Sequence, residues 1–219
     1  MATRQLLCEL ADAYASLTGT DVQFESAGGV DAAKRVAAGD PFDVVVLASD
    51  SIDQLAAAGR VLSESAAALV RSGVAVAVRR GAPWPVIRSE GCLRASVLAA
   101  RAIGYSTGPS GAALQRLFER WGIADRVRER MVQAPPGVAV GNLVARGDVE
   151  LGFQQLSELM HLDDIEVVGP MPDAVQIVTT FSGAVCSRSE QPDAVRALLD
   201  FMRSPSAADA KRRHGMEPA

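Results

Sequence analysis

Residues 103–111 have the sequence Ile-Gly-Tyr-Ser-Thr-Gly-Pro-Ser-Gly, in which a short apolar strand runs into a loop of glycine and hydroxyl side chains. A helix is predicted directly after this loop, because Leu114, Leu117, Phe118 and Trp121 recur on one helical face. A strand, a glycine-rich loop and a helix in this order form the repeating unit of α/β folds. The stretch therefore predicts an α/β fold with this loop at the carboxyl end of a strand.

The same order occurs nearer the N-terminus. Residues 22–24 alternate as a short strand does, residues 26–29 form a Ser-Ala-Gly-Gly loop, and residues 31–38 are predicted to be a helix that ends at Gly39. The apolar run at residues 44–47 predicts a strand buried on both faces. Further helices are predicted at residues 3–17, 52–58, 92–101, 138–145, 192–203 and 206–213, and further strands at residues 74–78, 131–133, 149–153, 166–168 and 175–187.

Two stretches interrupt the αβ alternation and predict two lobes. Residues 79–85 are rich in arginine, glycine and proline, and the long strand at residues 175–187 is broken at Ser182-Gly183. We expect a two-lobed α/β fold with two mostly parallel sheets joined by two crossing segments. The predicted boundaries are 1–75 plus 180–219 for lobe one and 76–179 for lobe two, with hinges near 72–83 and 170–182.

The composition is that of a globular chain without a nucleic-acid-binding face. Of 219 residues, 48% are hydrophobic and 22% are charged, and the formal net charge is -4. The basic residues are scattered, and residues 211–213 (Lys-Arg-Arg) are typical of the last turn of a helix. No uninterrupted apolar stretch approaches the length of a membrane span. We therefore expect neither a nucleic-acid partner nor a membrane segment.

Metal, cofactor and hydrolase chemistry find little support. Cys8, Cys92 and Cys186 are widely spaced, as reduced thiols are, and they lack the spacing of zinc ligands. His161 and His214 lie in polar segments, where a surface position is the expected one. The loop at residues 106–111 lacks the lysine of a nucleotide-binding P-loop. We expect no metal and no cofactor, and the sequence indicates no catalytic residue outside the alternative described below.

Glycine-rich loops at helix entries are candidate anion sites, because unpaired N–H groups and a partial positive charge meet there. The expected donors are the hydroxyls and backbone amides of Ser106, Thr107, Ser110 and Gly111, with Ser26, Gly28 and Gly29 in the other lobe. A third helix entry supplies Gly137 and Val138. The carboxyl end of the strand predicted at residues 149–153 delivers Gln154 and Gln155 to the same side. A glutamine here could instead tie down the hinge backbone. Since these loops contain no Lys or Arg, neutral donors are the predicted mode of recognition.

Several segments resemble the molybdate-binding proteins of the type 2 periplasmic-binding-protein fold over residues 2–216. The resemblance rests on the sequences at residues 37–45, 48–50, 103–106, 109–111, 149–153 and 213–216. It implies a solute-binding protein that holds a small oxyanion or carboxylate in the cleft between its lobes. It also implies an ABC transporter as partner if the protein is exported.

Two departures from this family bear on the ligand. Gln155 stands where the molybdate binders have a tyrosine, and the loop around Ser26 is about two residues longer. A few proteins that resemble the family are isomerases of small tricarboxylates such as aconitate. The alternative function is therefore an isomerase of an unsaturated di- or tricarboxylate, with Glu25, Tyr105 and Ser106 as candidate acids and bases.

The beginning of the sequence also differs, because the chain starts within the helix that follows the family's first strand. We expect residues upstream of Met1, or a partner chain, to supply a strand beside residues 44–46 and a hydroxyl-bearing loop. As written, the chain is expected in the cytoplasm, and a natural start further upstream would place it in the periplasm.

Overall fold

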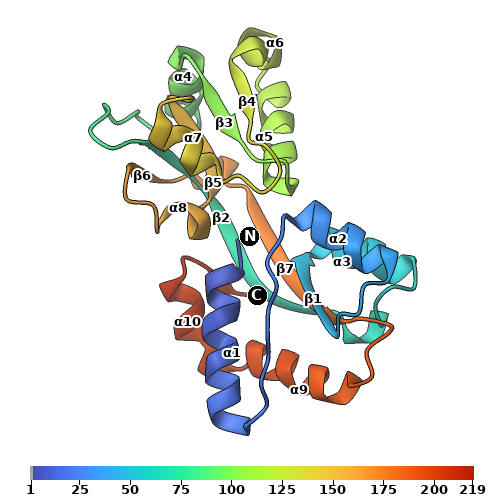
Figure 1. The fold of residues 1–219 in the computed structure, drawn as a ribbon. Coiled ribbons are helices and arrows are strands. Elements are labelled where there is room, and N and C mark those ends of the chain that lie inside the picture. Colours follow the sequence, from blue (N-terminus) through green and yellow to red (C-terminus); the bar gives the residue numbers. More distant parts are fainter. Residues whose placement is uncertain (1) are drawn as a thin grey trace. The chain divides into compact units, whose positions relative to one another are not determined.

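The computed structural model describes residues 2–219, and these form two compact units. Unit 1 comprises the described residues up to Ser72 together with Thr179–Ala219, and unit 2 comprises Gly73–Val178. The chain passes between the units within β2 (Ala67–Arg79) and again at the start of β7 (Val178–Val185) (Figure 1). The α/β character is confirmed, whereas hinge motion at residues 72–83 and 170–182 stays a prediction.

The sheet of unit 1 is built from antiparallel pairs. β1 (Val44–Ala48) pairs with β7, with Val44 opposite Val185, and β2 pairs with β8 (Glu217–Pro218). In the strand order β7 lies between β1 and β2. The prediction of a mostly parallel sheet is therefore wrong for the pairs β1–β7 and β2–β8. The reason is that the returning strand β7 takes the place beside β1 and runs against it.

Helices cover both faces of the unit 1 sheet. The helices α1 (Arg4–Thr18), α9 (Pro192–Arg203) and α10 (Ala208–Arg213) form one cluster with Val44 and Val46. The helices α2 (Gly29–Ala38) and α3 (Ser49–Ala57) form another cluster with Val45 and Leu47. Alternate residues of β1 thus enter opposite layers, as the pleat of a strand requires.

Residues 20–28 contain no strand, so the strand predicted at residues 22–24 is wrong. Val22 and Phe24 are partly buried against the α1 and α9 cluster. A strand needs a neighbouring backbone to complete its ladder. Within residues 2–219, β1 ends the strand order and has β7 as its neighbour there. The alternation of Val22 and Phe24 is therefore satisfied by side-chain packing alone.

Unit 2 has a mixed sheet. β3 (Ile103–Tyr105) lies between β4 (Met131–Gln133) and β5 (Leu151–Gln155) and is parallel to both. The second half of β2 pairs in antiparallel fashion with β5 on one side and with β6 (Ile165–Pro170) on the other. The three parallel strands are the part that the glycine-loop pattern predicted.

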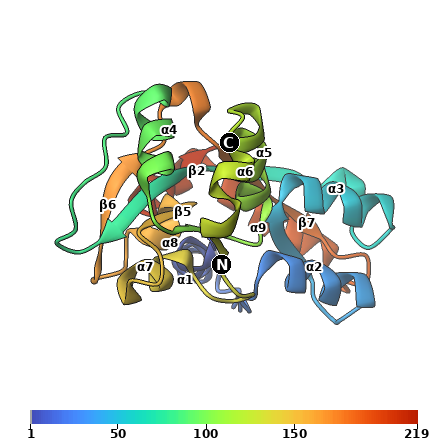
Figure 2. The ribbon, with the colours of Figure 1, turned by 90° about the horizontal axis from the view of Figure 1, so that it is seen from above.

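Helices lie on both faces of this sheet as well. Val74, Val76 and Val78 of β2 join the core formed with α4 (Glu90–Ala99), α5 (Pro109–Arg120) and α6 (Ala124–Val127). The intervening alanines join the core formed with α7 (Val140–Arg146) and α8 (Leu156–Leu159). Figure 2 shows α4 and α7 on opposite sides of β2 and β5. Short 3-10 turns occupy Ser63–Ser65, Arg128–Arg130, Asp173–Val175 and Pro205–Ala207.

Two glycines set the distance between α7 and the unit 2 sheet. A Cβ atom added to Gly104 would lie 2.8 Å from a methyl group of Val140. A Cβ atom on Gly152 would overlap Val144 and lie 3.3 Å from the same methyl group of Val140. Helix α7 therefore rests on the bare backbone of β3 and β5.

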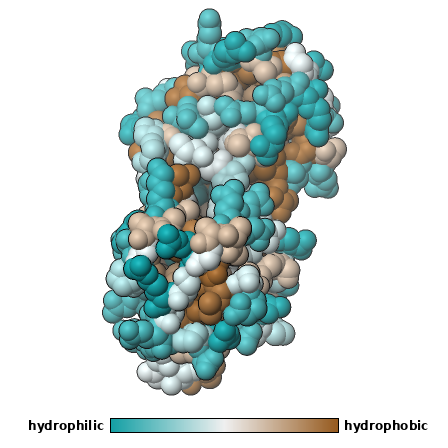
Figure 3. Space-filling model, turned by 90° about the vertical axis from the view of Figure 1, so that its right-hand side faces the viewer, coloured by the Kyte–Doolittle hydropathy of each residue, from teal (hydrophilic) through white to brown (hydrophobic). Residues whose placement is uncertain are grey.

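Within residues 2–219, no helix combines the length and the apolar character that a bilayer span needs. The face drawn in Figure 3 is mainly hydrophilic, and its hydrophobic residues form separate brown patches.

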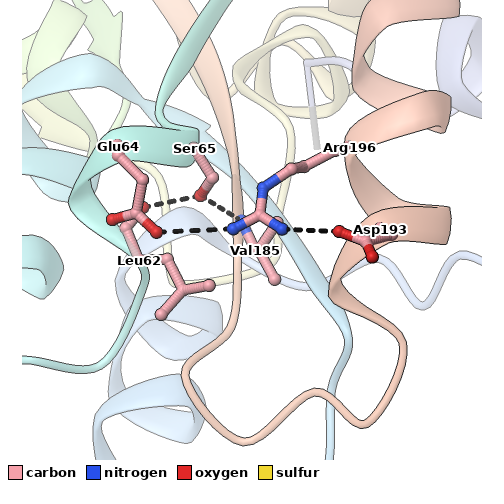
Figure 4. Close-up of polar contacts among 6 residues, drawn as sticks. All are labelled: Leu62, Glu64, Ser65, Val185, Asp193 and Arg196. Atoms are coloured by element: carbon pink, nitrogen blue, oxygen red, sulfur yellow. Dashed lines mark hydrogen bonds and ion pairs between the residues drawn. The ribbon is translucent and has the colours of Figure 1, made fainter.

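Ser65 ties the turn before β2 to the end of β7 (Figure 4). Its Oγ atom accepts a hydrogen bond from the Val185 amide at 2.9 Å and donates to the Leu62 carbonyl oxygen at 2.6 Å. Beside it, Arg196 of α9 contacts Glu64 at 3.4 Å and Asp193 at 2.8 Å. The hydrogen bond from Val185 to Ser65 is buried and the one from Ser65 to Leu62 is partly buried, whereas the two ion pairs are exposed to solvent.

We predict that Ser65→Ala lowers the free energy of unfolding by about 1–3 kcal/mol, because the Val185 amide loses its acceptor inside the core. Chemical denaturation of both proteins measures this difference. Glu64→Gln, which removes only a screened ion pair, is the control and should change stability by less than about 0.5 kcal/mol. An equal loss of unfolding free energy in Ser65→Ala and Glu64→Gln would contradict a stabilising role for the Ser65 hydrogen bond.

Glu9 connects α1 to the end of α10. Its carboxylate contacts Arg213 and lies 2.7 Å from Nε2 of His214. The hydrogen bonds from Arg213 and then from His214 lower the pKa of Glu9 below its ordinary value. A lowered carboxyl pKa gives stability that is present above the unfolded pKa and is lost as the pH falls through the folded pKa.

We therefore predict that the stability difference between the wild type and Glu9→Gln is present at pH 6 and disappears in acid below about pH 4. Because Glu9 is 37% exposed, solvent screening keeps this difference below about 1 kcal/mol. Urea unfolding at a series of pH values measures it. Asp209→Asn, in the exposed pair with Arg212, serves as control, and a difference independent of pH would contradict the prediction.

Candidate anion-binding site

Three loops of unit 2 leave the same edge of its sheet. Tyr105 at the end of β3 lies opposite Gln133 of β4 and Phe153 of β5, and all three strands run in one direction. The loops that begin at Ser106, at Ala134 and after Gln155 therefore start side by side. Ligands of open α/β sheets bind at this carboxyl edge.

The first loop, residues 106–111, holds two hydroxyls together. The Oγ atoms of Ser106 and Ser110 are 3.1 Å apart. Ser110 is buried, Ser106 is half-buried and Thr107 is exposed. A Cβ atom on Gly111 would overlap the carbonyl oxygen of Ser106, so only glycine lets the loop fold back on the first turn of α5. Local packing thus fixes the positions of both serines.

The N-terminus of α5 adds backbone donors and a partial positive charge. Gly108 is the N-cap and Pro109 the first helical residue. The amides of Gly111 and Ala112 donate to the Gly108 carbonyl oxygen at 3.0 and 3.3 Å. The Ser110 amide has no acceptor in the part of the chain that the structure describes. This amide and the hydroxyls of the loop are donors suited to an anion.

Gln154 has its amide group engaged within unit 2. Its Oε1 atom accepts from the Gly141 amide at 3.1 Å, and its Nε2 atom donates to the carboxylate of Glu158. The bonds connect β5 to the start of α7 and to α8. The geometry favours the alternative stated above, in which a glutamine ties down backbone, over a Gln154 amide that faces a ligand.

The other residues expected from this edge are less available than the serines. The Val138 amide donates to the Pro135 carbonyl oxygen at 3.0 Å, and Gly137 has φ 77° in that turn. The helix expected from residue 138 begins at Val140. Gln155 is 4% exposed at the end of β5. Their role in binding stays a prediction.

Unit 1 offers a second helix entry. Ser26 and Gly29 are exposed, and Gly28 is the N-cap of α2 without a side-chain cap. A hydroxyl pair that the sequence analysis did not select lies nearby in this unit. Ser49 at the start of α3 lies 2.8 Å from the Oγ atom of Ser182 and donates to the Thr180 carbonyl oxygen at 3.1 Å. The position of Ser49 directly after a buried strand could have indicated it.

The candidate acids and bases have partners that restrict their chemistry. Glu25 pairs with Arg35, which also contacts Asp40 at 2.8 Å and stacks on Phe42. The hydroxyl of Tyr105 accepts from Gln115 at 3.1 Å. Of the three candidates, Ser106 is the one that lies in the loop at residues 106–111, where its hydroxyl contacts that of Ser110.

Glu158 is a titratable residue that the sequence analysis missed. Burial raises the pKa of its carboxyl group above the ordinary value, and the hydrogen bond from Gln154 opposes this shift. A raised carboxyl pKa in a polar setting is common at functional sites. Nothing in the local sequence distinguishes Glu158 from the exposed glutamates, because its burial arises from tertiary packing. Residues 2–219 contain no group of three or more His, Cys, Asp or Glu arranged to hold a metal ion.

Comparison with known proteins identifies one relative over nearly the whole chain and another over half of it. An aconitate isomerase from Pseudomonas sp is 39% identical over 218 residues, which cover 96% of this chain and 82% of that protein. The molybdate-binding protein ModA from Azotobacter vinelandii is 23% identical over 113 residues, 50% of this chain and 44% of that protein.

The solved structure of an Azotobacter vinelandii periplasmic molybdate-binding protein has the same fold. It matches with a TM-score of 0.83 at 18% identity and covers 99% of this chain and 96% of that one. The family model described as "Bacterial extracellular solute-binding protein" matches residues 1–217. The resemblance stated from the sequence is thus confirmed, and the chain belongs to the family of bacterial extracellular solute-binding proteins.

Proposed function

We propose that this protein binds a small oxyanion or carboxylate with the hydroxyl and amide donors of residues 106–111. The observation that carries the proposal is the serine pair at the N-terminus of α5, held in place by Gly111. Membership of a family of solute-binding proteins also supports a ligand-binding role for this loop.

Neutral donors are sufficient for this task. The helix terminus contributes roughly half an elementary charge, and hydrogen bonds from neutral donors to an ionised acceptor are stronger than those between neutral groups. The loop contains no arginine or lysine, so the bound anion keeps its charge without a salt bridge. A solute carrier benefits from such binding, because the ligand must later be released.

Delivery to an ABC transporter on the outer side of the membrane is the corresponding biological role. The support for it is the family membership, in which the proteins are extracellular. In unit 1, considered by itself, Ser26, Gly28 and Gly29 are proposed as anion donors, together with the hydroxyls of Ser49 and Ser182.

We predict that the bound anion raises the melting temperature, as mass action requires for a ligand of the folded state. Molybdate, sulfate and citrate are the probes, in a thermal-shift titration at constant ionic strength. Ser106→Ala should weaken binding roughly tenfold or more, since a hydrogen bond to a charged group contributes about 1.5–3 kcal/mol. Ser16→Ala, which removes an exposed hydroxyl of α1, is the matched control. No response to any anion, or equal binding by both variants, would contradict the proposal.

A second candidate function is favoured by the relative with 39% identity, an aconitate isomerase. In such a reaction a base removes a proton from the methylene carbon of the substrate. The double bond then moves by one position, and a proton is returned to the carbon at its other end. Glu158 is the group on this edge whose raised pKa suits proton transfer, with Tyr105 and Ser106 as further candidates.

For this alternative we predict that cis-aconitate incubated with the protein in deuterated water incorporates deuterium and converts to the trans isomer, as followed by proton NMR. Glu158→Gln should lower the rate by roughly 100-fold or more if its carboxyl group transfers the proton. Citrate binding measured on the same variant separates lost chemistry from lost binding. Absence of both exchange and isomerisation in the wild type would leave the binding function alone.

A further inference from the structure

Lys211 is a buried cation without a counter-ion. Its side chain on α10 is 2% exposed, and among residues 2–219 no hydrogen bond or ion pair involves its ammonium group. Together with Leu6, Leu69 and Met202, Lys211 lines a small apolar gap in unit 1. Burial, and then the charge of Arg203, lower the pKa of Lys211. An ammonium ion desolvated in this way is costly unless an anion joins it.

Lys211 also borders a larger pocket of about 400 Å³ in unit 1. The pocket lies between the start of β2, at Ala68 and Leu69, and the end of α9, at Arg203 and Ser204. Its volume falls in the range of small-molecule sites, which is about 300–1,000 Å³. It is far larger than a single water or a halide ion requires.

The side chains around the pocket include two cations, Arg203 and Lys211, and one anion, Asp200, so their formal charges sum to +1. Arg203 and Lys211 contribute two cationic groups, and Ser204 contributes a hydroxyl. Asp200 also borders the pocket, but it is 79% exposed and lies 4.0 Å from Arg203. Among residues 2–219, the carboxylate of Asp200 makes its ion pair with Arg203 and none with Lys211. The buried cation therefore has room for an acceptor that the protein itself does not supply.

We propose that this pocket is a second anion site, which binds a small polyvalent oxyanion such as a dicarboxylate or a phosphorylated compound between Lys211 and Arg203. The site differs in kind from the loop at residues 106–111, because here the donors are cations. It belongs entirely to unit 1 and does not depend on the function proposed above. An anion in this pocket would contact residues of α10, α9 and β2 at the same time and would therefore stabilise unit 1.

The sequence makes this proposal unusually easy to test, because Lys34 and Lys211 are the two lysines of the chain. Lysine labelled with carbon-13 at Cε gives one NMR signal for each residue. Lys34 is exposed on α2 and acts as an internal reference. We expect inorganic phosphate or citrate, added at constant ionic strength, to shift the Lys211 signal in a saturable way. Its pKa should rise by about one unit for a tenfold preference for the charged form.

Arg203→Gln should weaken the Lys211 response to citrate roughly tenfold, whereas Ser106→Ala should leave it unchanged. Lys211→Met replaces the buried cation with an apolar side chain of similar length. Added to Ser106→Ala, it should abolish the citrate binding that remains in that variant. Alone, it should not lower the melting temperature below that of the wild type. Parallel shifts of the Lys34 and Lys211 signals with salt, or an Arg203→Gln response equal to that of the wild type, would overturn the proposal. Phosphate and citrate together separate a phosphate preference from a carboxylate preference.

Discussion

Both sheets of the protein depend on the continuous hydrogen-bonded backbone of β2. The strand spans thirteen residues, of which the first six belong to unit 1 and the rest to unit 2. Val70 pairs with Pro218 in one sheet, and Val74 pairs with Gln155 in the other. From Val74 to Val78 the side chains are at most 1% exposed. No residue of this segment can be lost without unpairing the backbone of a neighbouring strand, and unpaired buried groups are costly.

The sequence predicted those parts of the fold whose signals are local. The helix at residues 192–203 and the strand at residues 131–133 match the structure at both ends, because their periodicity and flanking residues determine them. The strand at residues 22–24 was wrong because strand formation depends on a neighbour that local alternation does not reveal. The predicted parallel direction was wrong for β1 and β7 for the same reason. Whether these strands run parallel or antiparallel depends on where the chain returns to the sheet.

The candidate site shows the same division. The loop at residues 106–111 was visible from glycine and hydroxyl composition, and the structure brings Ser106 and Ser110 within hydrogen-bonding distance. Ser49 and Ser182 are 133 residues apart in sequence and meet only in the folded chain. The engagement of Gln154 with Gly141 and Glu158 likewise arises from the packing of α7 and α8 against β5. Sequence alone can therefore propose donors, but the folded structure decides which of them have partners already.

The contact of Val140 with Gly104 and Gly152 has a consequence for how such a protein can change its ligand. Since neither strand position accepts a Cβ atom without moving α7, these positions are closed to gradual variation. The turn that precedes α7 would move with the helix, so any larger residue there would disturb the loop edge as a whole. Variation can instead accumulate in the loops that leave this edge, where a side chain changes without altering the distance between helix and sheet. Relatives that bind a ligand and relatives that catalyse a reaction are then expected to differ in their loop residues. At positions 104 and 152 glycine is expected in both, because α7 lies too close for a side chain.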